Sequence, residues 1–197
     1  MTHIMVDLET LSTRSNARIL AIGAVKFTPE RGVYDRFYRA IFTPSIDVVE
    51  KFNDVGGFHV SKSTLDWWRD QSIEARAVFA DPDSMFIDGA LMSFTNWVSE
   101  DTPKRDAIMW GNGASFDNSI LSTAYALCGL EQPWEFWNNS CYRTLKNAFP
   151  EVSFERIGVH HNAVDDAESQ ARHLLRIMER MEKAKRLLAI EEATKGE

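Results

Sequence analysis

HIMVDLET, residues 3–10, is a short apolar run that ends in two acids. Such a run is typical of a central β-strand, and the strand period of two places Asp7 and Glu9 on the same face. Two carboxylates on one face of a buried strand are costly unless a positive charge neutralises them. A divalent ion is the simplest source of that charge, since Mg²⁺ binds through few carboxylates. The pair is a candidate metal site, although strand-end acids also occur for structural reasons.

The residues around this run predict one α/β domain. Residues 19–28 (ILAIGAVKFT) are apolar and β-branched and stop at Pro29, and residues 33–42 alternate as a hairpin partner would, so we expect a three-strand meander. Further along, the pattern predicts helices over 61–71, from 83 to 98, from 115 to 129, over 144–149 and over 163–192, and a short strand at 107–110. This order predicts a single domain over residues 1–197, with a mixed sheet and flanking helices.

Composition and charge restrict the class of function. The 197 residues are 44% hydrophobic and 26% charged, which is ordinary for a globular protein, and they contain no apolar run long enough to cross a membrane. The N-terminus lacks the regions of a signal peptide, and Cys128 and Cys141 fit neither a disulfide framework nor a zinc site. We therefore expect a cytoplasmic protein with two reduced core thiols and no membrane partner.

The net charge of −7 is unusual for a protein that binds nucleic acid by neutralising phosphates. A chain with this charge would hold a polyanion through bound cations and base stacking. The acidic clusters are therefore of interest, although a solvated acidic surface is the ordinary explanation for a single charge run.

Two further acids stand at predicted helix starts. Asp117 follows a strand that ends in glycine, the place where α/β sheets bind ligands, although a carboxylate there also suits the helix dipole. In the last helix, either Asp165 or Asp166 could be a ligand, and helix geometry favours Asp166. Asp166 shares the inward face with Ala163, Gln170, Leu174 and Ile177, whereas Asp165 shares the solvent face with Ser169, Arg172, Arg176 and Arg180.

Three segments together resemble the exonuclease motifs of the DEDDh 3′–5′ exonucleases, which have a ribonuclease H-like fold. They are Asp7-Leu8-Glu9-Thr10, Phe116-Asp117 with Leu121 following, and His161 followed five residues later by Asp166. The resemblance runs from residue 4 to about 175. The loop at 12–16 and Thr64-Leu65-Asp66-Trp67-Trp68 are most similar to the stand-alone phage and bacterial branch of the exonuclease VIII type, which includes a ribonuclease acting on RNA tails. Ser140-Cys141-Tyr142-Arg143-Thr144 departs from that branch, which often has an acid before its Arg-Thr segment.

The resemblance implies an enzyme that degrades single-stranded nucleic acid from its 3′ end to nucleoside 5′-monophosphates. Two Mg²⁺ or Mn²⁺ ions about 4 Å apart would flank the scissile phosphate, held by Asp7, Glu9, Asp117 and Asp166. His161 would take the proton from the attacking water, because the ordinary pKa of histidine lies near neutrality. A lone loop histidine would more often bond to backbone, but the spacing to Asp166 favours the base.

Substrate contacts are expected at Leu8, Thr10, Trp67, Trp68, Asn112 and Arg143. The backbone at Leu8 and the side chain of Thr10 would hold the terminal nucleotide, as the resemblance implies. Trp67 and Trp68 offer a surface on which bases could stack. The alternative for this pair is that Trp68 packs in the core while Trp67 is half exposed.

Three questions stay open in the sequence. We expect DNA to be preferred over RNA, with an exoribonuclease as the alternative, since nothing visible decides whether the site accepts a 2′-OH. An inactive nucleic-acid-binding domain of the same fold is a second alternative. Trp134, Phe136 and Trp137 would form an exposed apolar patch suited to a homodimer.

Overall fold

The computed structural model describes residues 1–51, 54–113 and 115–195. Its strands are β1 (Thr2–Thr10), β2 (Ile19–Thr28), β3 (Gly32–Ala40), β4 (Asp54–Val55), β5 (Phe58–His59), β6 (Ala107–Gly111) and β7 (Asn139–Cys141). Its helices are α1 (Ile46–Val49), α2 (Lys62–Arg69), α3 (Ile73–Arg76), α4 (Ile87–Ser99), α5 (Asp117–Leu127), α6 (Tyr142–Ala148) and α7 (Ala163–Lys195), with 3-10 turns at Ala77–Ala80, Lys104–Asp106 and Phe136–Asn138.

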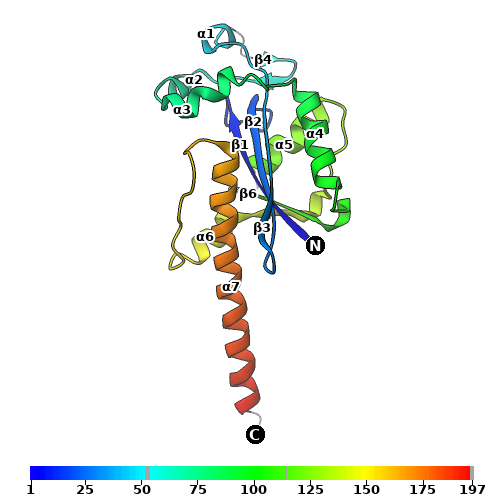
Figure 1. Ribbon diagram of the computed structural model, residues 1–197, viewed down its shortest axis with the longest axis vertical. Coiled ribbons are helices and arrows are strands. Elements are labelled where there is room, and N and C mark those ends of the chain that lie inside the picture. Colours follow the sequence, from blue (N-terminus) through cyan, green and yellow to red (C-terminus); the bar gives the residue numbers. More distant parts are fainter. Residues whose placement is uncertain (52–53, 114, 196–197) are drawn as a thin grey trace.

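A mixed five-stranded sheet carries the domain, in the order β3-β2-β1-β6-β7. The strands β1, β2 and β3 pair antiparallel as the predicted meander, while β6 and β7 add parallel to β1. Figure 1 shows α7 on one side of the sheet and α4 with α5 on the other. The predicted mixed sheet with flanking helices is therefore confirmed.

The side chains of β1 point alternately into two cores, and this alternation determines which face of the sheet carries the acids. Ile4, Val6 and Leu8 belong to the core shared with α4 and α5. Met5 belongs to the core on the other face, which it shares with residues of α7 such as Ala171. Since Asp7 and Glu9 have the same parity as Met5, they lie on the face of the sheet that α7 covers.

One glycine lets α7 begin close to the sheet. Gly23 on β2 pairs with Asp7 across the ladder, and a Cβ there would lie 2.1 Å from the carbonyl carbon of Ala163, the first residue of α7. A side chain at this position would push the helix away. Because the backbones meet here, the first turn of α7 lies beside the acidic end of β1.

The starts of α4, α5 and α6 differ from the prediction, and α6 begins at Tyr142 and not at Thr144. The helix expected from Asp83 begins at Ile87, because Met85 exchanges backbone hydrogen bonds with Ala40 and Phe42 and so extends the sheet edge. Ser115, the expected N-cap, lies one residue too early, since α5 begins at Asp117 after Phe116. The shorter elements α1, α3, β4, β5 and β7 were not predicted.

Burial corrects two further expectations. Trp134 is fully buried, so the predicted apolar patch reduces to Phe136 and Trp137, which are exposed. A homodimer stays a prediction. Cys128 and Cys141 are half-buried and not core residues. Across the part of the chain that the structure describes, no helix is long and apolar enough to span a bilayer.

Candidate active site

Three carboxylates meet near the end of β1. Asp7 and Glu9 lie on this strand, and Asp166 lies in the first turn of α7. One oxygen from each residue lies within 4.8 Å of the other two. Glu9 and Asp166 are buried. The strand and the helix thus bring two distant parts of the sequence together at a distance that oxygen ligands of one divalent ion can span.

Asp117, the fourth predicted acid, is held by backbone groups at the same strand end. Its Oδ1 accepts a hydrogen bond from the N–H of Leu8 at 3.2 Å, and its Oδ2 accepts one from the N–H of Asn112 at 2.9 Å. Gly111 makes this approach possible, because a Cβ there would lie 2.9 Å from the Cβ of Asp117. Asp117 is buried against β1, with Leu8 of that strand as a direct partner.

Burial raises the pKa values of Asp7, Glu9 and Asp117, and repulsion from neighbouring acids adds to the shift at Asp7 and Glu9. Burial raises the pKa of Asp7 well above its ordinary value, and Asp117, Glu9 and Asp166 raise it further. The pKa of Glu9 rises to about 8, mainly through burial and then through Asp166 and Asp117. Burial also raises the pKa of Asp117 to about 6, although the backbone hydrogen bonds from Leu8 and Asn112 oppose the shift.

These shifts test whether the residues fit a metal ion. Carboxylates that are costly to ionise together are stabilised by a divalent cation, which supplies the missing positive charge. Carboxylate oxygens are also the ligands that Mg²⁺ and Mn²⁺ prefer over softer donors. The acidic group Asp7, Glu9 and Asp166, with Asp117 beside it, therefore fits divalent cations of this class.

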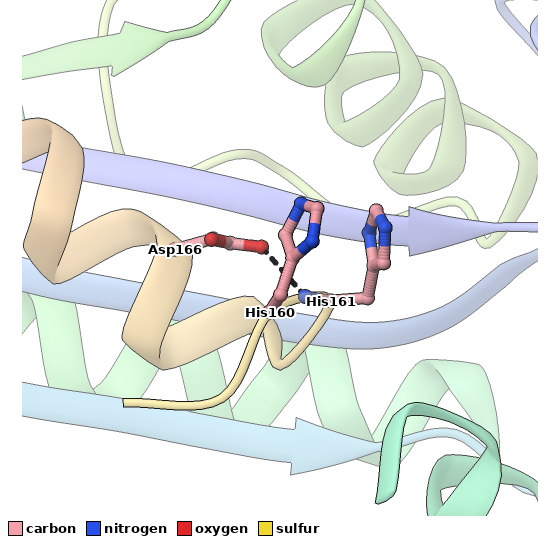
Figure 2. A group of neighbouring side chains, drawn as sticks. All are labelled: His160, His161 and Asp166. Carbon is pink, nitrogen blue, oxygen red and sulfur yellow. Dashed lines mark hydrogen bonds between the residues drawn. The ribbon is translucent and has the colours of Figure 1, made fainter. Parts of the chain in front are cut away.

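His161 lies at the mouth of this acidic group in an unusual backbone conformation. Its φ of 62° is left-handed, which is uncommon for a residue with a side chain. Its N–H donates to Oδ2 of Asp166 at 3.0 Å, as Figure 2 shows. The imidazole stacks on His160, with 3.7 Å between centroids, and packs T-shaped against the ring of Trp67, with 4.8 Å between centroids. Burial and then His160 lower the pKa of His161, so a neutral ring is favoured at neutral pH, although Asp166 opposes the shift.

A cleft of about 510 Å³ opens over these residues, and one of the two predicted stacking tryptophans lines it. Trp67 lines the cleft and is 41% exposed, so its ring is accessible to a base. Trp68 is fully buried, and its Nε1–H donates to the carbonyl of Thr10 at 2.9 Å. The expectation that Trp68 contacts substrate is therefore wrong, because its ring packs in the core and holds the end of β1.

The other predicted contact residues do not all line the cleft. Leu8, Thr10 and Asn112 line the cleft. The hydroxyl of Thr10 is engaged by the carbonyl of Ser12 at 2.8 Å, and the N–H of Leu8 by Asp117. Arg143 donates from Nη2 to the carbonyl of Asn112 and lowers the pKa of Asp117, but it is not among the residues that line the cleft.

Asp165 is not the exposed surface charge that the sequence predicted. Its side chain is 19% exposed, its Oδ2 accepts from the N–H of Val159 at 2.8 Å, and its Oδ1 accepts from Arg36 at 2.7 Å. Ser169, expected on the same solvent face, is fully buried under the loop and bonds to Ile157. The face was assigned to solvent because helical periodicity does not show that residues 157–159 fold back over α7.

Sequence reasoning missed three side chains that reach the site. Gln170 Nε2 donates to Oδ1 of Asp7 at 2.7 Å, and its position one turn after Asp166 on the inward face was the available signal. Arg156 forms an ion pair with Asp166. Lys146 lines the cleft. Neither basic residue belongs to a motif, and no spacing rule identifies them.

The fold matches solved nuclease structures. The nuclease domain of 3'hExo, a DEDDh family member bound to rAMP, matches with a TM-score of 0.60 and 12% identity, covering 90% of this chain and 92% of that one. Escherichia coli Exonuclease I in complex with a dT13 oligonucleotide matches with a TM-score of 0.60 and 14% identity, covering 95% of this chain and 43% of that one. At these identities the likeness shows the fold alone. Together with the motifs and the family match below, it defines a 3′–5′ exonuclease of the DEDDh type.

Sequence comparison gives the family. The model of the 3'-5' exoribonuclease Rv2179c-like domain matches residues 2–178, and the chain belongs to that family. An exodeoxyribonuclease of Enterobacteria phage T4 is 28% identical over 163 residues, which are 73% of this chain and 70% of the phage protein. The predicted superfamily and the predicted exonuclease activity are confirmed. The two names differ in the sugar of the substrate.

Proposed function

We propose that this enzyme hydrolyses single-stranded DNA from the 3′ end to nucleoside 5′-monophosphates, with residues 1–197 acting as one exonuclease domain. The observation that carries the proposal is the meeting of Asp7, Glu9 and Asp166 within 4.8 Å in a cleft that also contains His161. Asp117, next to Leu8 of the same strand, completes the acidic set.

In this proposal, Asp7, Glu9, Asp117 and Asp166 hold two divalent ions. When bound, such ions supply the positive charge that the carboxylates lack and polarise the phosphate that is attacked. The chain's own part is to keep the oxygens in place. Gln170 holds Asp7, the backbone of Leu8 holds Asp117, and the backbone of His161 holds Asp166. Ligands fixed by partners of this kind lose little entropy when the ions bind.

His161 is proposed as the general base. Its lowered pKa keeps the imidazole neutral near pH 7, so a ring nitrogen can accept the proton of the attacking water. The contacts with His160 and Trp67 limit the rotation of the ring, and the hydrogen bond from its backbone to Asp166 keeps it beside the acids. A base held in one orientation contributes roughly 10²–10⁴ in rate.

The proposed preference for single strands rests on the exposed ring of Trp67. Trp67 offers one aromatic surface at the cleft wall, and a base can stack there when it is not paired. A duplex end would first have to unpair. The likeness to the phage T4 exodeoxyribonuclease motivates DNA as the substrate, whereas the description of the family motivates RNA as the second candidate.

The experiment compares DNA and RNA oligomers of matched sequence, labelled at the 5′ end, with Mg²⁺, with Mn²⁺ and with a chelator. We expect a ladder that shortens from the 3′ end, faster digestion of single strands than of blunt duplex, and no products with the chelator. Faster digestion of RNA than of DNA would replace the first candidate by the second. Products that persist in the chelator would contradict the metal-dependent mechanism.

A further inference from the structure

The two oxygens of Asp166 have partners of different kinds. Oδ2 accepts the backbone N–H of His161 at 3.0 Å, the bond drawn in Figure 2. Oδ1 accepts from the Nη1 of Arg156, with which Asp166 forms an ion pair. A backbone donor cannot leave unless the chain refolds locally, but a side chain can rotate away. Oδ1 is therefore the oxygen that an incoming divalent ion can take, and the guanidinium of Arg156 competes for it.

The position of Arg156 allows this exchange. It lies in the segment between α6 and α7 that has no regular secondary structure, and its side chain is 39% exposed. The guanidinium also lies 5.7 Å from the ring of Phe154, a weak contact that does not fix it. By contrast, the backbone next to it is anchored, since the N–H of Ile157 donates to Ser169 on α7 at 3.0 Å. The guanidinium can thus leave Asp166 while its backbone stays at the cleft.

The cleft gives the released guanidinium a second partner. Arg156, Lys146 and Phe154 line it together with the acids, so the basic side chains lie beside the place where a nucleotide phosphate must enter. Arginine binds phosphate through two parallel hydrogen bonds. A guanidinium that neutralises a buried carboxylate before the ion arrives, and a phosphate afterwards, never remains unpaired in the cleft.

We propose that Arg156 exchanges the carboxylate of Asp166 for a substrate phosphate, so that the nucleotide and the divalent ion bind cooperatively. This inference rests on the proposed metal site. Without nucleotide, Arg156 competes with the ion and weakens its binding. With nucleotide, the phosphate holds Arg156, and Oδ1 of Asp166 is released to the ion. Linkage requires the reciprocal effect, in which the ion strengthens nucleotide binding by the same factor.

The test measures Mn²⁺ binding by calorimetry, without turnover, in the presence and absence of dTMP and, separately, of AMP. Arg156→Gln removes the charge and keeps much of the side-chain length. We expect the variant without nucleotide to bind Mn²⁺ roughly tenfold more tightly than the wild type, because the competing charge-assisted hydrogen bond is gone. The gain in Mn²⁺ affinity on adding nucleotide should be roughly tenfold smaller in the variant than in the wild type.

Lys146→Gln is the matched control. It removes the same charge from the same cleft, but Lys146 is not the partner of Asp166, so its effect on Mn²⁺ binding measures attraction through space alone. We expect Mn²⁺ affinity within about threefold of the wild type for this variant, from one exposed charge in screened solvent. Arg156→Lys should lie between the wild type and Arg156→Gln. Unchanged thermal unfolding of the variants confirms that they are folded.

Four results separate the inference from the function on which it rests. Equal or weaker Mn²⁺ binding by Arg156→Gln overturns the exchange, and so does an equal gain for Lys146→Gln. If Asp166→Asn loses Mn²⁺ affinity in the same experiments, the metal site stands even when the exchange fails. Mn²⁺ binding that Asp166→Asn leaves unchanged overturns both proposals.

Discussion

Replacing Glu9 by glutamine should stabilise the enzyme when no metal is bound, by an amount that depends on pH. Burial and the neighbouring acids raise the pKa of Glu9 from 4.5 to about 8. Between these values the folded protein keeps a proton that the unfolded chain has lost, so the free energy of unfolding falls as the pH rises. The slope is about 1.4 kcal/mol per pH unit, and the total approaches about 5 kcal/mol above pH 8.

The glutamine amide resembles the protonated carboxyl and does not titrate. The variant and the wild type should therefore have nearly equal stability at pH 4.5, and the variant should be more stable by up to about 5 kcal/mol at pH 8.5. Urea unfolding in a chelator at several pH values measures the difference. Glu100→Gln is the control, because it makes the same chemical change at an exposed position.

Metal should reduce this difference in stability. An ion held by Glu9 stabilises the folded wild type by about 2.7 kcal/mol at 100 times its dissociation constant, and the glutamine variant should gain less. A constant difference between variant and wild type from pH 4.5 to 8.5 would refute the reasoning, as would a glutamine variant less stable than the wild type at pH 8.5. Either result would mean that Glu9 is already neutralised inside the metal-free protein.

Further predictions concern turnover. Asp166→Asn should abolish hydrolysis, whereas Asp165→Asn should keep turnover within a few-fold and lower the melting temperature by a few degrees, because it weakens the acceptor that holds the loop before α7. Equal loss of activity for the two would show that the assignment of the ligand is wrong. His161→Ala should lower kcat by about 10² or more, with His160→Ala mild, and the wild-type rate should rise with pH through a pKa below the usual value for histidine; a flat profile from about pH 5 to 8 contradicts a histidine base. Trp67→Ala should raise KM more than it lowers kcat, since stacking on a base contributes equally to the ground state and the transition state; steady-state kinetics on a single-stranded oligomer would show the opposite if the ring positions the reacting phosphate.

The sequence predicted β1, β2 and β3 well because these strands are long and their signals are local. The bounds of β2 follow directly from the apolar run that stops at Pro29, and the period of two in β1 places Asp7 and Glu9 on one face. The close approach of α7 is a different matter. It depends on Gly23, whose missing side chain matters only because the backbone of Ala163 lies against it. A single glycine in an apolar run does not reveal that neighbour.

The sequence predicted the acidic residues of the candidate site but missed the basic residues Arg156 and Lys146. The difference has a physical cause. Metal-ligand chemistry needs particular residues at particular positions of regular elements, so Asp117 and Asp166 have recognisable spacing. Arg156 reaches Asp166 from a segment without regular structure, where neither period nor spacing fixes the direction of a side chain. For Trp67 and Trp68 the sequence suggested stacking by both rings. Adjacent helical residues point about 100° apart, however, so Trp67 lines the cleft while Trp68 is buried in the core.

The acids that suit a metal ion destabilise the fold when no ion is bound. Hydrogen bonds from neutral and positive donors reduce this cost. Gln170 shares a hydrogen bond with Asp7 without adding charge, and Arg156 lends a full charge to Asp166. Burial and the neighbouring acids raise the pKa of Glu9, so a bound proton neutralises this carboxylate in place of a cation. A proton and a guanidinium can both leave when a divalent ion arrives, whereas a permanent buried lysine could not. The partners of the acids are therefore informative too, since the guanidinium of Arg156 and the proton of Glu9 are the groups that a divalent ion would displace in the proposed site.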